Sequence, residues 1–305
     1  MSDHEKPTPL FNDVCLPFQI EGQDIKGRVL RLGPSVDEIL SKHNYPDHIN
    51  KLLGQTLALT AMLGSMMKYD GILTVQMKGK GPLRMMVSDF FKAEKSDKGI
   101  IRAYAGYDEG DHQDYSLEEL FGEDAYLAIT MDQGKYMDRY QGIVKLLGTN
   151  ITEAAEEYFK SSEQLPTKAN IFCQKDKNGK WQAGAIMIQH YARNSEDDID
   201  RDIEKTQEDW NTASILLSTL KPSELLDVEL SLQDLLIRLY HESGVRIFSH
   251  TELGAGCRCS SDKIRTALSG LEYEELKEAA EDGIIKVTCD FCTTEHKFEL
   301  TKLLH

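Results

Sequence analysis

Residues 46–68 have the sequence PDHINKLLGQTLALTAMLGSMMK, and this stretch sets the arrangement of the elements around it. Proline suits the first turn of a helix, so we expect a helix that Pro46 opens and that runs to about Lys68. From Leu52 to Met67 this helix has no polar face, and small residues are interspersed along it. A helix that is apolar nearly all round is buried on several sides. The stretch therefore predicts a buried central helix between sheets.

The segments around this helix alternate between strand and helix patterns. A capping-box pattern at Ser35-Val-Asp-Glu38 predicts a short helix through His43, and Ser116 begins another. Turn signals at Gly79-Lys-Gly81 and Asn178-Gly179 separate short apolar runs, as in hairpins. Strands are expected at 72–77, 83–88, 101–107, 125–131, 139–146, 170–175 and 181–190, with a further helix at 152–161. Strand pairs alternating with single helices predict an antiparallel-rich α+β fold, and we assign residues 1–193 to an N-terminal mixed α/β domain.

The composition of the 305 residues argues against several classes of protein. Hydrophobic residues make up 40% and charged residues 28%, which is ordinary for a globular protein. The formal net charge is −16, whereas affinity for nucleic acid depends on clustered Lys and Arg. No run approaches the roughly 18 apolar residues of a membrane span, and the N-terminus MSDHEKPTPLFND lacks a secretion signal pattern. We expect a cytoplasmic protein that binds neither nucleic acid nor membrane.

The composition changes at Asn194, where an acidic segment begins. Residues 196–209 contain eight acidic side chains, opposed only by Arg201 and Lys205. Like charges at helical spacing repel each other, and few apolar groups anchor the segment before Ile215. One interpretation is a solvated helix face or mobile linker, and the other is a helical linker of low intrinsic stability. Helices are expected at 213–220 and 230–242, so we assign residues 194–247 to a helical linker.

Four of the six cysteines lie close to the C-terminus, in two pairs. Cys257-Arg-Cys259 is followed, after 29 residues, by Cys289-Asp-Phe-Cys292. In a reducing compartment such pairs are more often metal ligands or redox centres than structural disulfides. Four thiolates can enclose one Zn²⁺ tetrahedrally and leave no position open for a substrate. The spacing therefore predicts one zinc ion on these four cysteines, with His296 as an alternative ligand.

The tail at 248–305 is small enough for a metal to decide whether it folds. Structural zinc contributes on the order of 10–16 kcal/mol in small peptides, against the ~3–5 kcal/mol that so small a core supplies. Losing the metal should therefore unfold the tail. The sulfurs within each pair are close enough in sequence to form a disulfide, and such oxidation would expel zinc. Two interpretations stay open here: a thiol oxidation switch and a purely structural zinc site.

The remaining chemical signals are weak. Cys15 and Cys173 stand alone in apolar segments and are most simply small apolar residues. His241-Glu242 lacks the second histidine of a zinc-protease helix. A closed site of four cysteines cannot activate water, and the sequence has no nucleophile elbow and no paired-carboxylate signature. We expect no enzymatic activity, although an enzyme with dispersed catalytic residues and a structural zinc tail is the alternative.

The cysteine pattern and several other blocks resemble the heat-shock protein 33 family, the redox-regulated holdase chaperones of bacteria. The pattern CxC-x29-CxxC corresponds to the four zinc-binding redox cysteines of that family. Further family-like blocks are Tyr45-Pro46, YDGILTVQ at 69–76 with GKGP at 79–82, Tyr140-Gln-Gly142, and SEQLPT at 162–167. The likeness extends from about residue 30 to the end of the chain.

This resemblance implies an architecture and a mechanism. A metastable linker would join the α/β domain to a zinc-binding redox-switch domain at 248–305, and the reduced, zinc-bound form would be inactive. Peroxide with heat, or hypochlorous acid, would oxidise Cys289 and Cys292, zinc would leave, and Cys257 would pair with Cys259. The loosened linker would expose apolar surface that binds unfolding client proteins without ATP and prevents their aggregation. Activated members tend to form homodimers.

Overall fold

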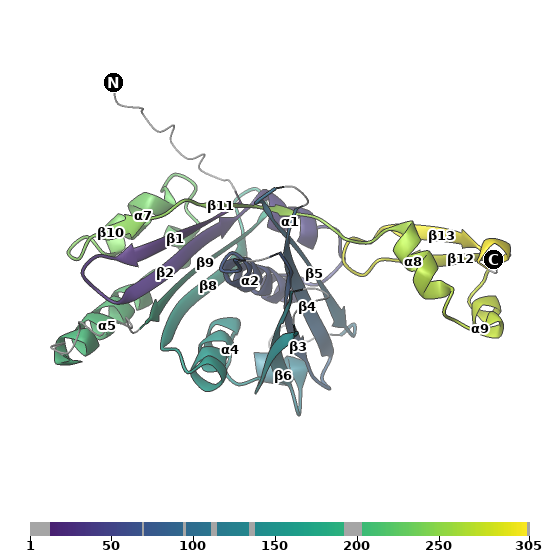
Figure 1. The fold of residues 1–305 in the computed structure, drawn as a ribbon, viewed down its shortest axis with the longest axis horizontal. Helices are drawn as coiled ribbons and strands as arrows, with labels where there is room; N and C mark the ends of the chain where they lie inside the picture. The colour runs from purple at the N-terminus through teal and green to yellow at the C-terminus, as the bar shows by residue number, and fades with distance from the viewer. Residues whose placement is uncertain are drawn as a thin grey trace, which may run out of the picture. The chain divides into compact units, whose positions relative to one another are not determined.

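The computed structural model describes residues 13–68, 70–93, 96–110, 115–133, 138–191 and 203–303. The chain forms two compact units, residues 1–255 and residues 256–305 (Figure 1). Most of the acidic segment that begins at Asn194 lies outside the described residues, which resume at Ile203. The functional division at residues 193 and 247 stays a prediction.

The first unit is built on one sheet of eleven strands, which curls round a helix (Figure 1). The strand order is β7-β6-β3-β4-β5-β11-β1-β2-β9-β8, and β10 also pairs with β1. Among the described strands every pairing is antiparallel except that of β11 with β5. This confirms the predicted antiparallel-rich fold. The strands of this unit are β1 Val14–Ile20, β2 Ile25–Leu32, β3 Ile72–Lys78, β4 Leu83–Lys92, β5 Gly99–Tyr107, β6 Tyr126–Asp132, β7 Tyr140–Lys145, β8 Thr167–Lys175, β9 Trp181–His190, β10 Val245–Ile247 and β11 Thr251–Ala255.

Strand β11 joins the two halves of the sheet. It pairs antiparallel with β1, where Glu252 lies opposite Val14, and parallel with β5, where Leu253 lies opposite Gly99. The sequence predicted a helix between separate sheets, and the structure has one continuous sheet instead. From the sequence alone residues 251–255 belong to the tail, because the segment TELGA is too short and too mixed to be recognised as a strand. Its pairing depends on partners more than 140 positions away in the chain.

The predicted central helix is α2, Asp47–Gly64, and it is buried along its length. It contacts strands of both halves of the sheet, β2, β3, β4, β5, β8 and β9 (Figure 1). The glycines allow close approach: a Cβ atom at Gly54 would collide with Cys173, and one at Gly64 would collide with Phe90. The helix ends before the predicted Lys68, where residues 65 and 66 form a turn.

The first helix corrects one detail of the sequence analysis. Helix α1 spans Pro34–Leu40, its N-cap is Gly33, and no side chain caps it from within. Proline at the first position begins the helix earlier than the expected Ser35 cap. The carboxylate of Asp13 takes the capping role, because it accepts hydrogen bonds from the backbone N–H groups of Gly33 (2.8 Å) and Ser35 (3.0 Å).

Two further helices of the first unit agree with their sequence signals. Helix α3, Leu117–Phe121, has the complete capping box between Ser116 and Glu119. Helix α4, Ile151–Tyr158, is capped by Asn150 and continues into a π-helical turn, Phe159–Glu163.

Three helices cover the face of the sheet that points away from α2. They are α5 Ile203–Ser218, α6 Pro222–Leu225 and α7 Leu232–Leu239. The sequence predicted α5 and α7 within the linker, but α6 was not predicted. The three helices and strands β1, β2 and β9 share a second apolar core, whose members are Val14, Leu16, Phe18, Ile20, Ile25, Val29, Ile186, Ile188, Ala213, Leu217, Leu220, Leu225, Leu230, Leu232, Leu235, Leu236 and Tyr240. The linker helices therefore belong to the first unit and hide one face of its sheet.

The second unit is small. It contains helix α8 Ser261–Leu268, helix α9 Tyr273–Glu278, a hairpin of β12 Ile284–Thr288 and β13 Glu295–Glu299, and a 3₁₀ turn Leu300–Lys302. Its core within the described residues consists of four buried side chains, Leu276, Ile285, Phe298 and Leu303, with partly buried neighbours. None of the described helices has both the length and the apolar character needed to cross a bilayer.

Candidate metal centre

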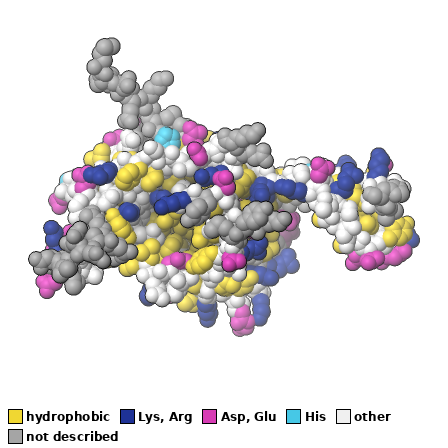
Figure 2. Space-filling model, viewed as in Figure 1, with side chains coloured by type: hydrophobic (Ala, Val, Ile, Leu, Met, Phe, Trp, Pro, Cys, Tyr) yellow, Lys and Arg dark blue, Asp and Glu magenta, His cyan; other side chains and the backbone are white. Residues whose placement is uncertain are grey.

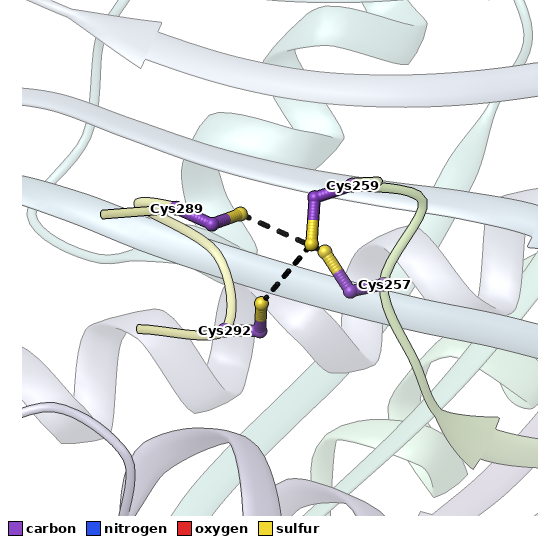
Figure 3. Close-up of side chains that lie close together, drawn as sticks. All are labelled: Cys257, Cys259, Cys289 and Cys292. Carbon is purple, nitrogen blue, oxygen red and sulfur yellow. Dashed lines mark hydrogen bonds between the residues drawn. The ribbon is translucent and has the colours of Figure 1, made fainter. Parts of the chain in front are cut away.

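The second unit brings its four cysteines together from two loops (Figure 3). Cys257 and Cys259 lie in the loop between β11 and α8, and both are half-buried. This loop ends at Ser260, whose hydroxyl caps α8 by accepting a hydrogen bond from the N–H of Lys263. The cap fixes the end of the loop immediately after the second thiol.

The other two cysteines lie in the turn between β12 and β13. The N–H of Cys289 donates to the carbonyl of Thr294 (3.0 Å), and the N–H of Thr293 donates to the carbonyl of Cys289 (2.8 Å). Thr293 has φ +58°, a left-handed conformation that a threonine rarely adopts. This tight turn places the sulfurs of Cys289 and Cys292 on the side that faces the first loop (Figure 3).

The distances between the sulfurs fit a single tetrahedral metal ion. Cys257 Sγ lies 3.7 Å from Cys289 Sγ, and Cys259 Sγ lies 3.5 Å from Cys292 Sγ. All four sulfurs lie within 4.8 Å of one another. Four sulfurs bound at about 2.3 Å to one zinc ion would lie about 3.8 Å apart. The four residues could therefore hold one divalent metal ion, and no ligand position would remain for a substrate.

The environment of the cluster shifts the pKa values of Cys259, Cys289 and Cys292 in different directions. Burial and the neighbouring thiols raise the pKa of Cys259, and burial, the larger cause, also raises the pKa of Cys289. Burial acts in the same direction on Cys292, but hydrogen bonds between Cys292 and the Thr294 side chain and backbone, and between Cys292 and Cys259, outweigh it and lower its pKa to about 6. Four thiolates in one place repel each other, and a bound cation would relieve that repulsion.

The structure also locates the other residues that the sequence singled out. The ring of His296 in β13 lies with Nδ1 3.1 Å from the hydroxyl of Ser261, and the described group that could hold a metal consists of cysteines alone. Cys15 and Cys173 lie in the core of the first unit, where burial raises the pKa of both thiols. They behave as the small apolar residues that the sequence predicted.

Thr294 is a residue of the site that the sequence did not indicate. Its hydroxyl lies 3.3 Å from the sulfur of Cys292. The only sequence signal for this contact is a hydroxyl residue two positions after the second cysteine of the CxxC pair. That signal predicts a contact with the sulfur only if a tight turn brings the hydroxyl back toward it.

Comparison with known proteins settles the family. A sequence model of the Hsp33 protein family matches residues 13–299. The chain belongs to the Hsp33 family. This confirms the resemblance that the cysteine pattern and the sequence blocks indicated.

Individual Hsp33 relatives match over nearly the whole chain. A 33 kDa chaperonin of Caulobacter vibrioides is 36% identical over 98% of this chain and 99% of its own length. One from Shewanella frigidimarina is 34% identical over 94% and 93%. The crystal structure of the 33 kDa chaperonin, a heat shock protein 33 homolog, from Thermotoga maritima has a TM-score of 0.78 at 22% identity and covers 96% of this chain and 98% of that one. The last comparison shows that the Hsp33 fold is shared.

Proposed function

We propose that this chain is a redox-regulated holdase chaperone that binds unfolding proteins without ATP. The observation that carries the proposal is the cluster of four thiols, within 4.8 Å of one another, in a unit whose described core is only four buried side chains. Family membership and the chaperonin names of the relatives support the chaperone part. The redox part rests on the chemistry of the cysteines.

In the proposed resting state the four cysteines are reduced and hold one Zn²⁺. The metal would supply folding energy to residues 256–305 and keep the sulfurs as thiolates. The described core of this unit is too small to supply that stability alone, as expected for so short a chain. In this proposal the second unit stays folded only while its four cysteines are reduced and bind the metal.

Activation in this proposal is the loss of four thiolates as metal ligands. Two equivalents of peroxide would oxidise the four zinc-bound thiolates to two disulfides. In each step a pair of thiolates gives up two electrons, two protons are taken from the solvent, and peroxide is reduced to two molecules of water, while zinc leaves as Zn²⁺. We assign the disulfides to Cys257 with Cys259 and to Cys289 with Cys292. Because sulfur distances of 3.7 Å and 3.5 Å also join the two loops, the pairing must be tested by disulfide mapping.

The client surface would be the face of the sheet that α5, α6 and α7 cover. In the chain, α7 is followed by β10, then β11, and then directly by the second unit. Unfolding of the second unit can therefore spread back along the backbone toward the linker helices. These helices already expose some apolar groups, since Ile215 is 65% and Ile237 54% exposed. On the face of the first unit in Figure 2, hydrophobic side chains lie among charged ones. Release of the helices would add the apolar residues beneath them.

A cytoplasmic location, a homodimer in the oxidised form and the absence of enzymatic activity complete the proposal. A cytoplasmic compartment keeps the thiols reduced until an oxidant arrives. A site closed by four protein ligands gives a bound metal no open position for catalysis.

The decisive experiment follows metal, thiols and chaperone activity together. Native mass spectrometry should find one zinc per reduced chain, and peroxide at raised temperature should remove it with four thiols. The same samples should then suppress aggregation of a thermally unfolding client protein. Cys15 and Cys173 provide the internal control, because both are buried and should stay reduced. Zinc loss without aggregation suppression would refute the chaperone switch, and a metal and thiols that resist peroxide would leave a structural site.

A further inference from the structure

A guanidinium is buried on the covered face of the sheet. Arg31 in β2 is only 3% exposed. Its Nε donates to the carbonyl of Leu225 (2.7 Å), and its Nη1 donates to the carbonyl of Leu230 (2.9 Å). Leu225 is the last residue of α6, and the final carbonyls of a helix have no partner within it. Arg31 thus binds both ends of the segment 225–230, which connects α6 to α7.

A glycine in the neighbouring strand lies beside Arg31. Gly184 in β9 lies directly opposite Arg31 in the ladder between β2 and β9. A Cβ atom at position 184 would lie 2.9 Å from Cγ of Leu225 and 2.9 Å from Cδ2 of Leu226. Both leucines are buried. The missing side chain therefore lets two leucines rest on the backbone of the sheet while Arg31 binds the carbonyls next to them.

The hydrogen bonds are what make a charge acceptable at this position. A buried charge is unfavourable unless it is hydrogen-bonded. Burial lowers the pKa of Arg31 to about 10, and the charge of Asp227 partly opposes that shift, so the guanidinium stays protonated at neutral pH. If segment 225–230 left the sheet, the two donors of Arg31 would lose these carbonyls, while the surrounding face would remain apolar.

An unfolding polypeptide has backbone carbonyls that could replace those that Arg31 loses when segment 225–230 leaves the sheet. Helices and sheets pair their backbone carbonyls, whereas an unfolding chain presents unpaired carbonyls beside aliphatic side chains. Segment 225–230, with the sequence LLDVEL, has this same combination. A purely apolar surface would bind the side chains alone.

We propose that Arg31 and Gly184 form a binding site for the backbone of an unfolding client. Its occupant is a short segment with bulky aliphatic side chains and two unpaired carbonyl groups. Residues 225–230 fill the site at rest and keep clients out. The proposal rests on the proposed chaperone function, and it adds Arg31 as a residue that determines which chain segments are bound.

The test uses a labelled peptide with the sequence of residues 221–231, KPSELLDVELS, and the full-length chain. Fluorescence anisotropy should show binding to the oxidised chain and at least about tenfold weaker binding to the reduced chain, whose site is filled. The Arg31→Met variant, oxidised, should bind the peptide about tenfold more weakly, the size expected for loss of charged hydrogen bonds. Lys26→Met removes the same charge from an exposed position of the same strand and should bind as the unchanged chain does.

Two further variants keep the test decisive. Arg31→Lys retains the charge but loses the fork of donors, so binding should weaken several-fold, and this variant decides the matter if Arg31→Met does not fold. A peptide with serine in place of both leucines that correspond to Leu225 and Leu226 should also bind more weakly.

The outcomes distinguish failure of the Arg31 site from failure of the proposed chaperone function. If the oxidised chain suppresses aggregation but the Arg31 variants bind the peptide as tightly as the unchanged chain, the carbonyl site is wrong and the chaperone stands. If the oxidised, unchanged chain does not suppress aggregation at all, the chaperone function itself fails.

Discussion

Leu253 is buried in the main core of the first unit, and Cys257 of the thiol cluster follows it after only three residues. Leu253 belongs to β11, the strand that pairs with both β1 and β5. The N–H of Leu253 also donates to the carbonyl of Asp13 (2.7 Å). One short strand thus joins the two halves of the curled sheet and leads the backbone into the thiol cluster, so a change at the thiols is linked covalently to the sheet.

Truncation of this side chain should make activation easier. Leu253→Ala removes a buried side chain and should lower the free energy of unfolding of the first unit by about 2–5 kcal/mol. Because β11 is then held less firmly, aggregation suppression should begin sooner after peroxide is added. Urea denaturation and the onset time measure the two effects. Ile237→Ala, at an exposed position, is the control and should change stability little. An unaltered onset in a destabilised Leu253→Ala chain would show that β11 does not transmit the change.

A methyl group at position 184 should lift the linker from the sheet in the reduced chain. Gly184→Ala places a Cβ against Leu225 and Leu226, and such overpacking costs about 1–3 kcal/mol. Hydrogen exchange in residues 213–240 should therefore be faster than in the unchanged protein. Gly106→Ala is the matched control, since a Cβ there meets its nearest neighbour only at 3.9 Å. Equal exchange in both variants would mean that the linker is not seated on Gly184.

Removal of the metal should unfold the second unit and leave the main core folded. The described core of the second unit is four buried side chains, whereas the first unit has two much larger clusters. A strong zinc chelator should therefore abolish exchange protection in residues 256–303, and added zinc should restore it. Strands β2 and β9 serve as the internal reference and should stay protected. Persistent protection of β12 and β13 without metal would show that the unit folds unaided.

Cys259, Cys289 and Cys292 should differ in their reactivity with pH in a short alkylation pulse given as the metal is removed, before the second unit unfolds. Because the pKa of Cys292 is lowered to about 6, this thiol is mostly thiolate at pH 7, and its alkylation should slow as the pH falls through about 6. The pKa values of Cys259 and Cys289 are raised, so both should react appreciably only at alkaline pH. Site-resolved mass spectrometry after timed alkylation measures this order.

A matched variant identifies the cause of that difference. Thr294→Val removes the hydroxyl that lies 3.3 Å from the sulfur of Cys292, and it should move the alkylation profile of Cys292 to higher pH. A profile that does not move would assign the low pKa to the neighbouring thiols instead.

Much of the local structure could be predicted from short stretches of sequence. The apolar helix at 46–68, the capping box at Ser116 and the hairpin through Asn178-Gly179 were predicted, and each depends on residues close together in the chain. Strands β1 and β2 were not predicted from the N-terminal segment, and α1 is capped by Asp13, far from it in the sequence, and not by the expected Ser35. Predictions failed where a distant partner decides the local structure.

The sequence by itself predicted which four cysteines meet in one cluster, because their two close pairs limit which thiols can come together, and it indicated the family through the same spacing. Only the tertiary structure decided that β11 unites the sheet, that α6 lies on Gly184, and that Arg31 binds the carbonyls of Leu225 and Leu230. The physical reason is that thiol spacing is a local property of the chain. The partners of a short strand or a buried guanidinium, by contrast, are fixed by contacts between residues as many as 194 positions apart.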